Sequence, residues 1–165
     1  MPPLEAIARR LGTSPGRQQR RCREEKAMNE PEVIREMLGD RGAKGRTIAV
    51  IGLSDNPAKA SYVVSAYMQS HGYRILPVNP EVESVLGEKS YASLKDLPVK
   101  PDVVNVFRLP CFLPGIVDEM LELGLRNLWV QMGIINLEAA AKAEAAGIRV
   151  VMDRCILVEH RRRDG

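Results

Sequence analysis

Few residues in this chain are of the types that carry covalent or acid–base catalysis. The cysteines and histidines are Cys22, Cys111, Cys155, His71 and His160. Cys155 follows Arg154, whose charge would favour the reactive thiolate, although a half-buried structural thiol is the favoured interpretation. Cys111 follows a proline at an expected helix start and is predicted to pack. Since no nucleophile and base are paired, no catalytic residue and no metal ligand is predicted.

Phosphate binding is better supported, at a turn that follows an apolar run. Gly52 has no side chain, so a ligand can approach the backbone there. Ser54, Asp55 and Asn56 can turn the chain before a helix whose first amides would attract an anion. Lys59 falls in the expected first helical turn, where a cation opposes the helix dipole unless a phosphate is bound. The competing interpretation is a tight turn with a solvated lysine.

Familiar nucleotide and hydrolase motifs fail at the same turn. It lacks the second and third glycines of the G-x-G-x-x-G dinucleotide fingerprint, and no G-x-x-x-x-G-K-[ST] sequence occurs. Asn56 stands where a G-x-S-x-G nucleophile elbow needs glycine. The second strand ends in Val78, Asn79 and Pro80, without the acid that holds the ribose of NAD. An NAD(P)-dependent oxidoreductase therefore ranks last among the functions considered.

The elements that position this turn form an α/β pattern. Short β-branched runs alternate with helix-length segments, which predicts a Rossmann-like, doubly wound, five-stranded parallel sheet in a single domain. Strands are predicted at residues 47–53, 73–78, 102–107, 127–131 and 148–152. Helices are predicted at residues 59–71, 92–97, 113–123 and 136–146, the last capped by Asn136. His71 is expected at a helix end, Trp129 in the core and His160 in a basic tail.

The chain divides into a leader and a body. Residues 1–27 carry seven basic and three acidic residues, a net charge of +4, and are predicted to be a poorly structured, dispensable leader. Two alternatives are a weak organelle-targeting segment and residues translated upstream of the true start. Residues 28–45 are predicted to hold an N-terminal helix, starting near Pro31, and a linker. Residues 46–163 form the predicted ligand-binding domain. Because the whole chain carries +3, residues 28–165 carry −1, so neither nucleic acid nor an anionic membrane is an expected partner.

Composition narrows the setting. The chain is 45% hydrophobic and 27% charged, as in ordinary globular proteins, and no apolar run has the length of a membrane span. Three scattered cysteines cannot build a disulfide framework. A reducing, cytoplasmic location is the simplest expectation.

The sequence resembles the CoA-binding domain family, whose members are related to the nucleotide-binding part of succinyl-CoA synthetase alpha chains. The resemblance rests on IAVIGLSDNP at 48–57, HGYRILPVNP at 71–80 and WVQMG at 129–133, with further matches at 59–62, 102–108 and 151–155 and at Glu159 and His160. It implies that the Rossmann-like sheet holds coenzyme A across the ends of the first three strands.

The resemblance also implies which residues line the ligand. For the diphosphate they are Gly52, Leu53, Ser54, Lys59, Ser61 and Tyr62. For the adenosine end they are Val78, Asn79 and Pro80, with Phe107 and Arg108 opposite. Gln131 and Gly133 would border the pantetheine arm. From the residues alone, Arg108 could equally be a surface ion-pair partner. A branched side chain at Gly52 is expected to block the ligand without unfolding the protein.

Three functions follow in order of preference. The first is a CoA- or acyl-CoA-binding protein without evident catalytic machinery, acting as a carrier, sensor or partner subunit. The second is an acyl-CoA-using enzyme with Cys155 as the acyl acceptor, and the third is the NAD(P)-binding protein already ranked last. The sequence leaves open a homodimer or an acyl-CoA-using partner protein.

Overall fold

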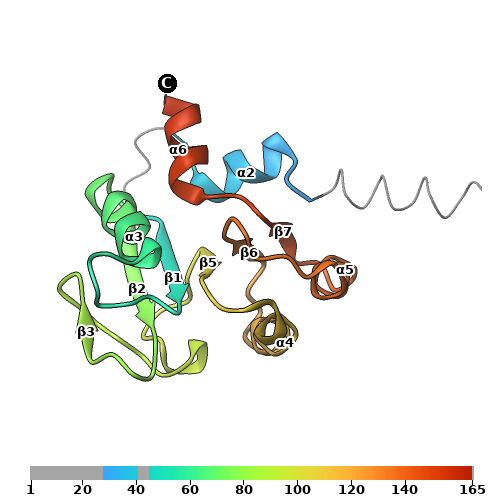
Figure 1. The fold of residues 1–165 in the computed structure, drawn as a ribbon. Helices are drawn as coiled ribbons and strands as arrows, with labels where there is room; N and C mark the ends of the chain where they lie inside the picture. Colours follow the sequence, from blue (N-terminus) through green and yellow to red (C-terminus); the bar gives the residue numbers. More distant parts are fainter. Residues whose placement is uncertain (1–27, 41–44, 165) are drawn as a thin grey trace, which may run out of the picture.

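The structure is a computed structural model that describes residues 28–40 and 45–164. The predicted leader, residues 1–27, and part of the predicted linker lie outside these residues. In the described part, five parallel strands form one sheet in the order β2-β1-β5-β6-β7 (Figure 1). These strands are β2 (Arg74–Val78), β1 (Thr47–Ile51), β5 (Val103–Val106), β6 (Asn127–Val130) and β7 (Arg149–Val151). The predicted five-stranded α/β fold is confirmed.

Helices cover both faces of the sheet, which explains why its strands are largely apolar. One face packs against α2 (Pro31–Leu38), α3 (Ala60–Ser70) and α6 (Ile156–Asp164), and the other against α4 (Leu113–Leu123) and α5 (Leu137–Ala145) (Figure 1). Within β1, Ala49 and Ile51 face the α4–α5 layer, whereas Ile48 and Val50 face the other. Trp129 is fully buried, as predicted, and its Nε1 donates to the Arg154 carbonyl at 2.8 Å.

Local sequence signals set the ends of the predicted helices. α3 ends at His71. α4 ends at Gly124, which takes a left-handed conformation with φ of 71°. Asn136 caps α5 as predicted, because its Oδ1 accepts from the Ala139 amide at 3.0 Å. The predicted helix at 92–97 is only a 3-10 turn, η2 (Leu94–Asp96), and it follows an unexpected two-stranded hairpin of β3 (Ser84–Val85) and β4 (Glu88–Lys89).

The end of the chain differs from its predicted form. Instead of a basic tail, residues from Ile156 onward form α6, and His160 lies in it with only 3% of its surface exposed. The hydroxyl oxygen of Tyr67, in α3, lies 2.9 Å from Nδ1 of His160. The prediction failed because three consecutive arginines, Arg161 to Arg163, hide the apolar face that Ile156 and His160 place against α3.

The N-terminal helix α2 belongs to the folded domain. It starts at Pro31, as predicted, and buries Met37 and Leu38. Ahead of it, Asn29 pairs with Met152 at the end of β7: its Oδ1 accepts from the Met152 amide at 2.7 Å, and its Nδ2 donates to the Met152 carbonyl at 2.9 Å. These two bonds attach the start of α2 to the last strand of the sheet.

Replacing Asn29 with alanine is expected to lower the free energy of unfolding by about 1–2 kcal/mol, since two hydrogen bonds to the backbone are lost. Asn29 also has a φ of 65°, a conformation that asparagine tolerates better than alanine. Urea unfolding followed by circular dichroism measures the change. Glu30→Ala is the matched control, because the Glu30 side chain caps nothing, and it should change stability by less than about 0.5 kcal/mol. Equal stability of the two variants would contradict the docking role.

Candidate functional site

The strand order reverses direction beside β1. The chain runs from β1 outward to β2 and then crosses back to β5 on the other side, so β1 and β5 flank the point where the order reverses. Ligands of open parallel sheets bind beyond the carboxyl ends of strands at such a point. The register aligns those ends, because Ile51 pairs with both Val78 and Val106, and Val106 pairs with Val130. The four predicted binding segments therefore lie along one edge.

Gly52 occupies the tightest position of this edge. Its amide donates to the Val78 carbonyl at 2.9 Å, and its φ is 85°. A Cβ on this residue would lie 2.8 Å from the Phe107 carbonyl oxygen and 3.1 Å from Cδ of Arg108. The expectation that a branched side chain here would leave the fold intact is wrong, because the backbone that follows β5 already fills the space.

The loop after Gly52 is held by its own hydrogen bonds. The Ser54 amide donates to Oγ of Ser61 at 3.0 Å, the Asn56 amide to Oγ of Ser54 at 3.1 Å, and the Ala58 amide to Oδ1 of Asn56 at 2.9 Å. Ser61 is buried, with 6% of its surface exposed, and its hydroxyl supports this loop through the bond to Ser54. Three hydrogen bonds within the loop and to the start of α3 favour one loop shape, which is the preorganisation that a binding turn requires.

The start of α3 brings two backbone amides close to a lysine. Lys59 is the residue that precedes the first helical turn, one position earlier than predicted, and it provides no side-chain cap. The amides of Ala60 and Ser61 have no hydrogen-bond acceptor among the described residues. Lys59 is exposed and has no partner within the same residues. Two unpaired amides, the positive end of the helix and a lysine therefore lie together.

At the end of β2, Asn79 forms hydrogen bonds to several neighbouring segments. Its Nδ2 donates to the Leu53 carbonyl at 3.1 Å, and its Oδ1 accepts from the Glu81 amide at 3.0 Å. Its backbone amide donates to the Tyr91 carbonyl at 2.8 Å, and its own carbonyl accepts from Oγ of Ser90 at 2.9 Å. The Asn79 side chain ties the first turn to the second, so it shapes the predicted adenosine end whether or not it touches a ligand.

The other two strand ends contribute different surfaces. The Arg108 guanidinium lies over the Phe112 ring, 4.1 Å from its centroid, and no ion-pair partner is found for it among the described residues. Gln131 is buried, and its Nε2 donates to Oδ1 of Asn105 at 3.0 Å. Gly133 is exposed, and its amide donates to Oδ1 of Asp153 at 2.8 Å.

The predicted residues thus divide by exposure. Those at least partly exposed along the edge are Gly52, Ser54, Lys59, Tyr62, Asn79, Pro80, Phe107, Arg108 and Gly133. Those with buried side chains are Leu53, Ser61, Val78 and Gln131. The second group supports the edge from beneath and could offer a ligand only backbone atoms.

Two structural residues of the site were missed by the sequence interpretation. Asn105, 2% exposed, is the buried partner of Gln131, and its polar side chain inside an apolar strand was the signal. Asp153 takes a φ of 58° and holds the Gly133 amide. Asn105 therefore had a local signal, whereas the role of Asp153 depends on the neighbouring loop at Gly133 and shows in no local pattern.

Among the described residues, the two cysteines lie in different surroundings. Cys155 is partly exposed and packs against the α2–α3–α6 face, as the half-buried interpretation predicts. Cys111 is exposed in η3 (Pro110–Phe112), so the expectation that it packs is wrong. None of the residues of this short 3-10 turn is buried. Within residues 28–40 and 45–164, no three His, Cys, Asp or Glu side chains are placed to hold a metal ion.

Two further features lie away from the edge. The pKa of Lys95 is raised because its ammonium donates to Glu122 of α4, an exposed pair. In the part of the chain that the structure describes, none of the helices is both long and apolar enough to cross a membrane.

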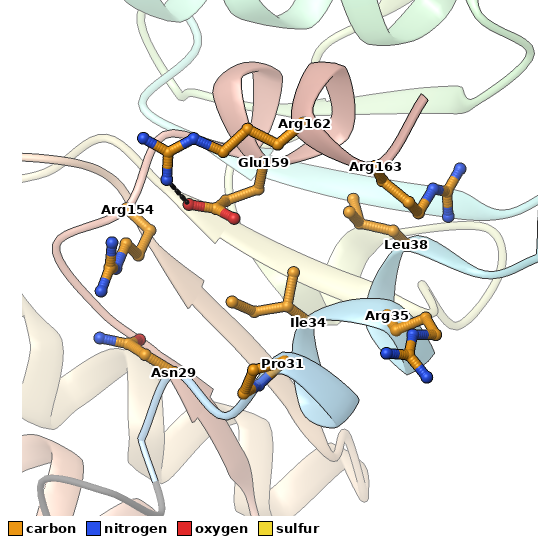
Figure 2. Close-up of a pocket in the computed structure, with 9 residues that line it drawn as sticks. All are labelled: Asn29, Pro31, Ile34, Arg35, Leu38, Arg154, Glu159, Arg162 and Arg163. Carbon is orange, nitrogen blue, oxygen red and sulfur yellow. Dashed lines mark hydrogen bonds and ion pairs between the residues drawn. The ribbon is translucent and has the colours of Figure 1, made fainter. Parts of the chain in front are cut away.

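A separate pocket of about 350 Å³ lies between α2 and α6 (Figure 2). Ile34 and Leu38 form an apolar part of its wall, and Glu159 enters it between the two helices. Glu159 and Arg162 form an ion pair at 3.4 Å. The pocket shares no lining residue with the strand-end edge. We place the candidate site at the edge, because the unpaired amides of Ala60 and Ser61 lie at the point where the strand order reverses.

Comparisons with known proteins agree with this geometry. A family model described as a CoA binding domain matches residues 46–161. An uncharacterized protein of Bacillus subtilis, YneT, is 44% identical over 117 residues, which cover 71% of this chain and 87% of that protein. A solved hypothetical protein from Pyrococcus horikoshii is 38% identical with a TM-score of 0.74, covering 81% of this chain and 92% of the other.

A more distant similarity links the chain to ligases. The alpha subunit of an ADP-forming acetate–CoA ligase from Pyrococcus furiosus is 33% identical over 84 residues, which cover 50% of this chain and 18% of that subunit. The chain therefore spans less than a fifth of that ligase subunit.

Proposed function

Because the chain belongs to the CoA binding domain family, we propose that it binds coenzyme A or an acyl-CoA at the strand-end edge, without chemistry of its own. The observation that carries the proposal is the start of α3, where the unpaired amides of Ala60 and Ser61 adjoin Lys59, shortly after the turn at Gly52. A diphosphate needs such a set of donors and positive charge.

In the proposed pose the ligand follows the order of the strands. The adenosine end lies over β2 at Asn79 and Pro80, and the diphosphate lies over β1. The pantetheine arm then crosses β5 and β6. Phe107 and Arg108 flank the crossing, and Arg108 adds a second positive charge at this edge.

Isothermal titration with CoA, acetyl-CoA, NAD and ATP tests the proposal. CoA and acetyl-CoA are expected to bind at least about tenfold more tightly than NAD or ATP, because only they reach from the β2 end to the β6 end, and a tenfold difference corresponds to about 1.4 kcal/mol. Tighter binding of NAD would contradict the proposal and favour the oxidoreductase alternative.

The absence of chemistry is tested separately. Incubation with acetyl-CoA followed by intact-mass measurement is expected to leave the protein unmodified. The partly buried Cys155 lies on the α2–α3–α6 face, and no base is hydrogen-bonded to it in the described residues. An added acetyl group that disappears in Cys155→Ser would instead establish the acyl-acceptor alternative. We further propose that the protein acts in the cytoplasm as a carrier, sensor or partner subunit for acyl-CoA-using proteins.

A further inference from the structure

Exposed apolar side chains gather at one end of the candidate site. Nine large apolar side chains are exposed among the described residues, and five of them lie in two short segments. These five are Leu109 (67% exposed), Phe112 (45%), Met132 (68%), Ile135 (51%) and Leu137 (49%). We call them the apolar rim.

The two segments of the rim are held together. The first leads through η3 into α4, the second joins β6 to α5, and α4 and α5 lie beside one another (Figure 1). Nδ2 of Asn136 donates to the Pro110 carbonyl at 3.0 Å, while its Oδ1 caps α5. The Asn136 side chain thus links both segments, so they form one continuous surface and not two independent loops.

The two segments that form the rim contain no charged residue of their own. Residues 109–117 and 132–137 contain no Asp, Glu, Lys or Arg, although such residues make up 27% of the whole chain. Exposed apolar surface that is concentrated in this way marks a binding surface more often than isolated apolar residues do.

The rim continues the proposed CoA site. Phe112 of the rim carries the Arg108 guanidinium on its ring, and Cδ of Arg108 adjoins the Gly52 turn. With the adenosine end over β2 and the diphosphate over β1, the thiol end of the ligand points toward β5 and β6. The apolar rim follows the ends of these two strands.

Resting on the proposed function, we propose that the apolar rim binds the acyl chain of an acyl-CoA. The ligand is then a thioester with an apolar acyl group of several carbons, and free CoA and acetyl-CoA are weaker ligands. An apolar chain would cover side chains that otherwise face water, and the gain should rise with each methylene covered.

Titration with CoA, acetyl-CoA, hexanoyl-CoA and decanoyl-CoA, each below its micelle-forming concentration, measures this gain. Affinity is expected to rise with chain length, by at least about tenfold from acetyl-CoA to decanoyl-CoA, which requires only about two buried methylenes. Equal affinity for all four compounds would overturn the acyl site and leave the proposed function standing. Failure of every compound, CoA included, would remove both.

A pair of double variants locates the gain. Met132→Ser with Ile135→Ser removes two rim side chains, whereas Val99→Ser with Val158→Ser removes two exposed apolar side chains elsewhere. The ratio of decanoyl-CoA to CoA affinity should fall several-fold in the rim variant and stay at its original value in the control. An unchanged ratio in the rim variant would overturn the inference.

Self-association is the main competing use of the rim. Analytical ultracentrifugation of the unliganded protein and the rim variant distinguishes it. A dimer that dissociates in the rim variant, together with equal affinity along the acyl series, would assign the rim to a second copy of the chain and overturn the acyl site.

Discussion

Replacement of Gly52 by valine is expected to lower the free energy of unfolding by about 2–6 kcal/mol. Part of the loss comes from holding a β-branched residue at a φ of 85°, and part from forcing its Cβ against the Phe107 carbonyl at 2.8 Å. Guanidinium unfolding followed by tryptophan fluorescence measures it, since Trp129 is buried in β6 of the same sheet. CoA binding by this variant reports on folding as well as on the site.

Gly133→Val separates the two causes. Gly133 has the same φ of 85°, but a Cβ there would meet nothing within 4 Å. It should therefore lose only the conformational part, about 1–3 kcal/mol. If the two variants are equally stable, the close approach of β5 to the first turn is not a constraint on the fold.

Lys59→Gln should weaken CoA binding by about 1.5–3 kcal/mol, the range for a hydrogen bond to a charged group. The same change should raise the stability of the free protein by about 0.3–1 kcal/mol, because it removes a cation from the positive end of α3. Titration calorimetry at two salt concentrations is the measurement. The affinity loss should shrink at high salt, since Lys59 is exposed and its ion pair would be screened.

Lys100→Gln is the matched control, because Lys100 is an exposed lysine ahead of β5, at the opposite edge of the sheet. It should leave CoA affinity at its original value. Dephospho-CoA then locates the contact. An equal loss for CoA and dephospho-CoA places Lys59 at the diphosphate, as we expect. A loss confined to CoA would place it at the ribose phosphate and reverse our orientation of the ligand, and no loss at all would leave Lys59 a solvated charge.

Much of this fold could be predicted because its signals are local. Each strand is a short, largely apolar run, and the position of its ends follows from the residues beside it. The helix boundaries at Pro31, Gly124 and Asn136 likewise follow from residues at the helix ends. The helix α6 was not predicted, because its arginines dominate the local composition. Its buried face forms only by contact with α3, which the local sequence does not show.

The candidate site could be predicted only as far as its segments. Strand alternation was enough to place residues 52–54, 78–80, 107–108 and 131–133 at one edge of a parallel sheet. Local pattern did not show which of these side chains would be buried. Gln131 faces inward because β5 offers Asn105 as its partner, and Asn79 is committed to the Leu53 carbonyl.

The sequence by itself determined the class of fold, the family and the turn at Gly52, because each rests on residues adjacent in the chain. Only the tertiary structure decided the strand order, the contact between Gly52 and Phe107, and the gathering of Leu109 and Met132 at one rim. These features join segments more than twenty residues apart. Their formation depends on which strands pair and which faces the helices cover, and that is settled by the burial of the whole core.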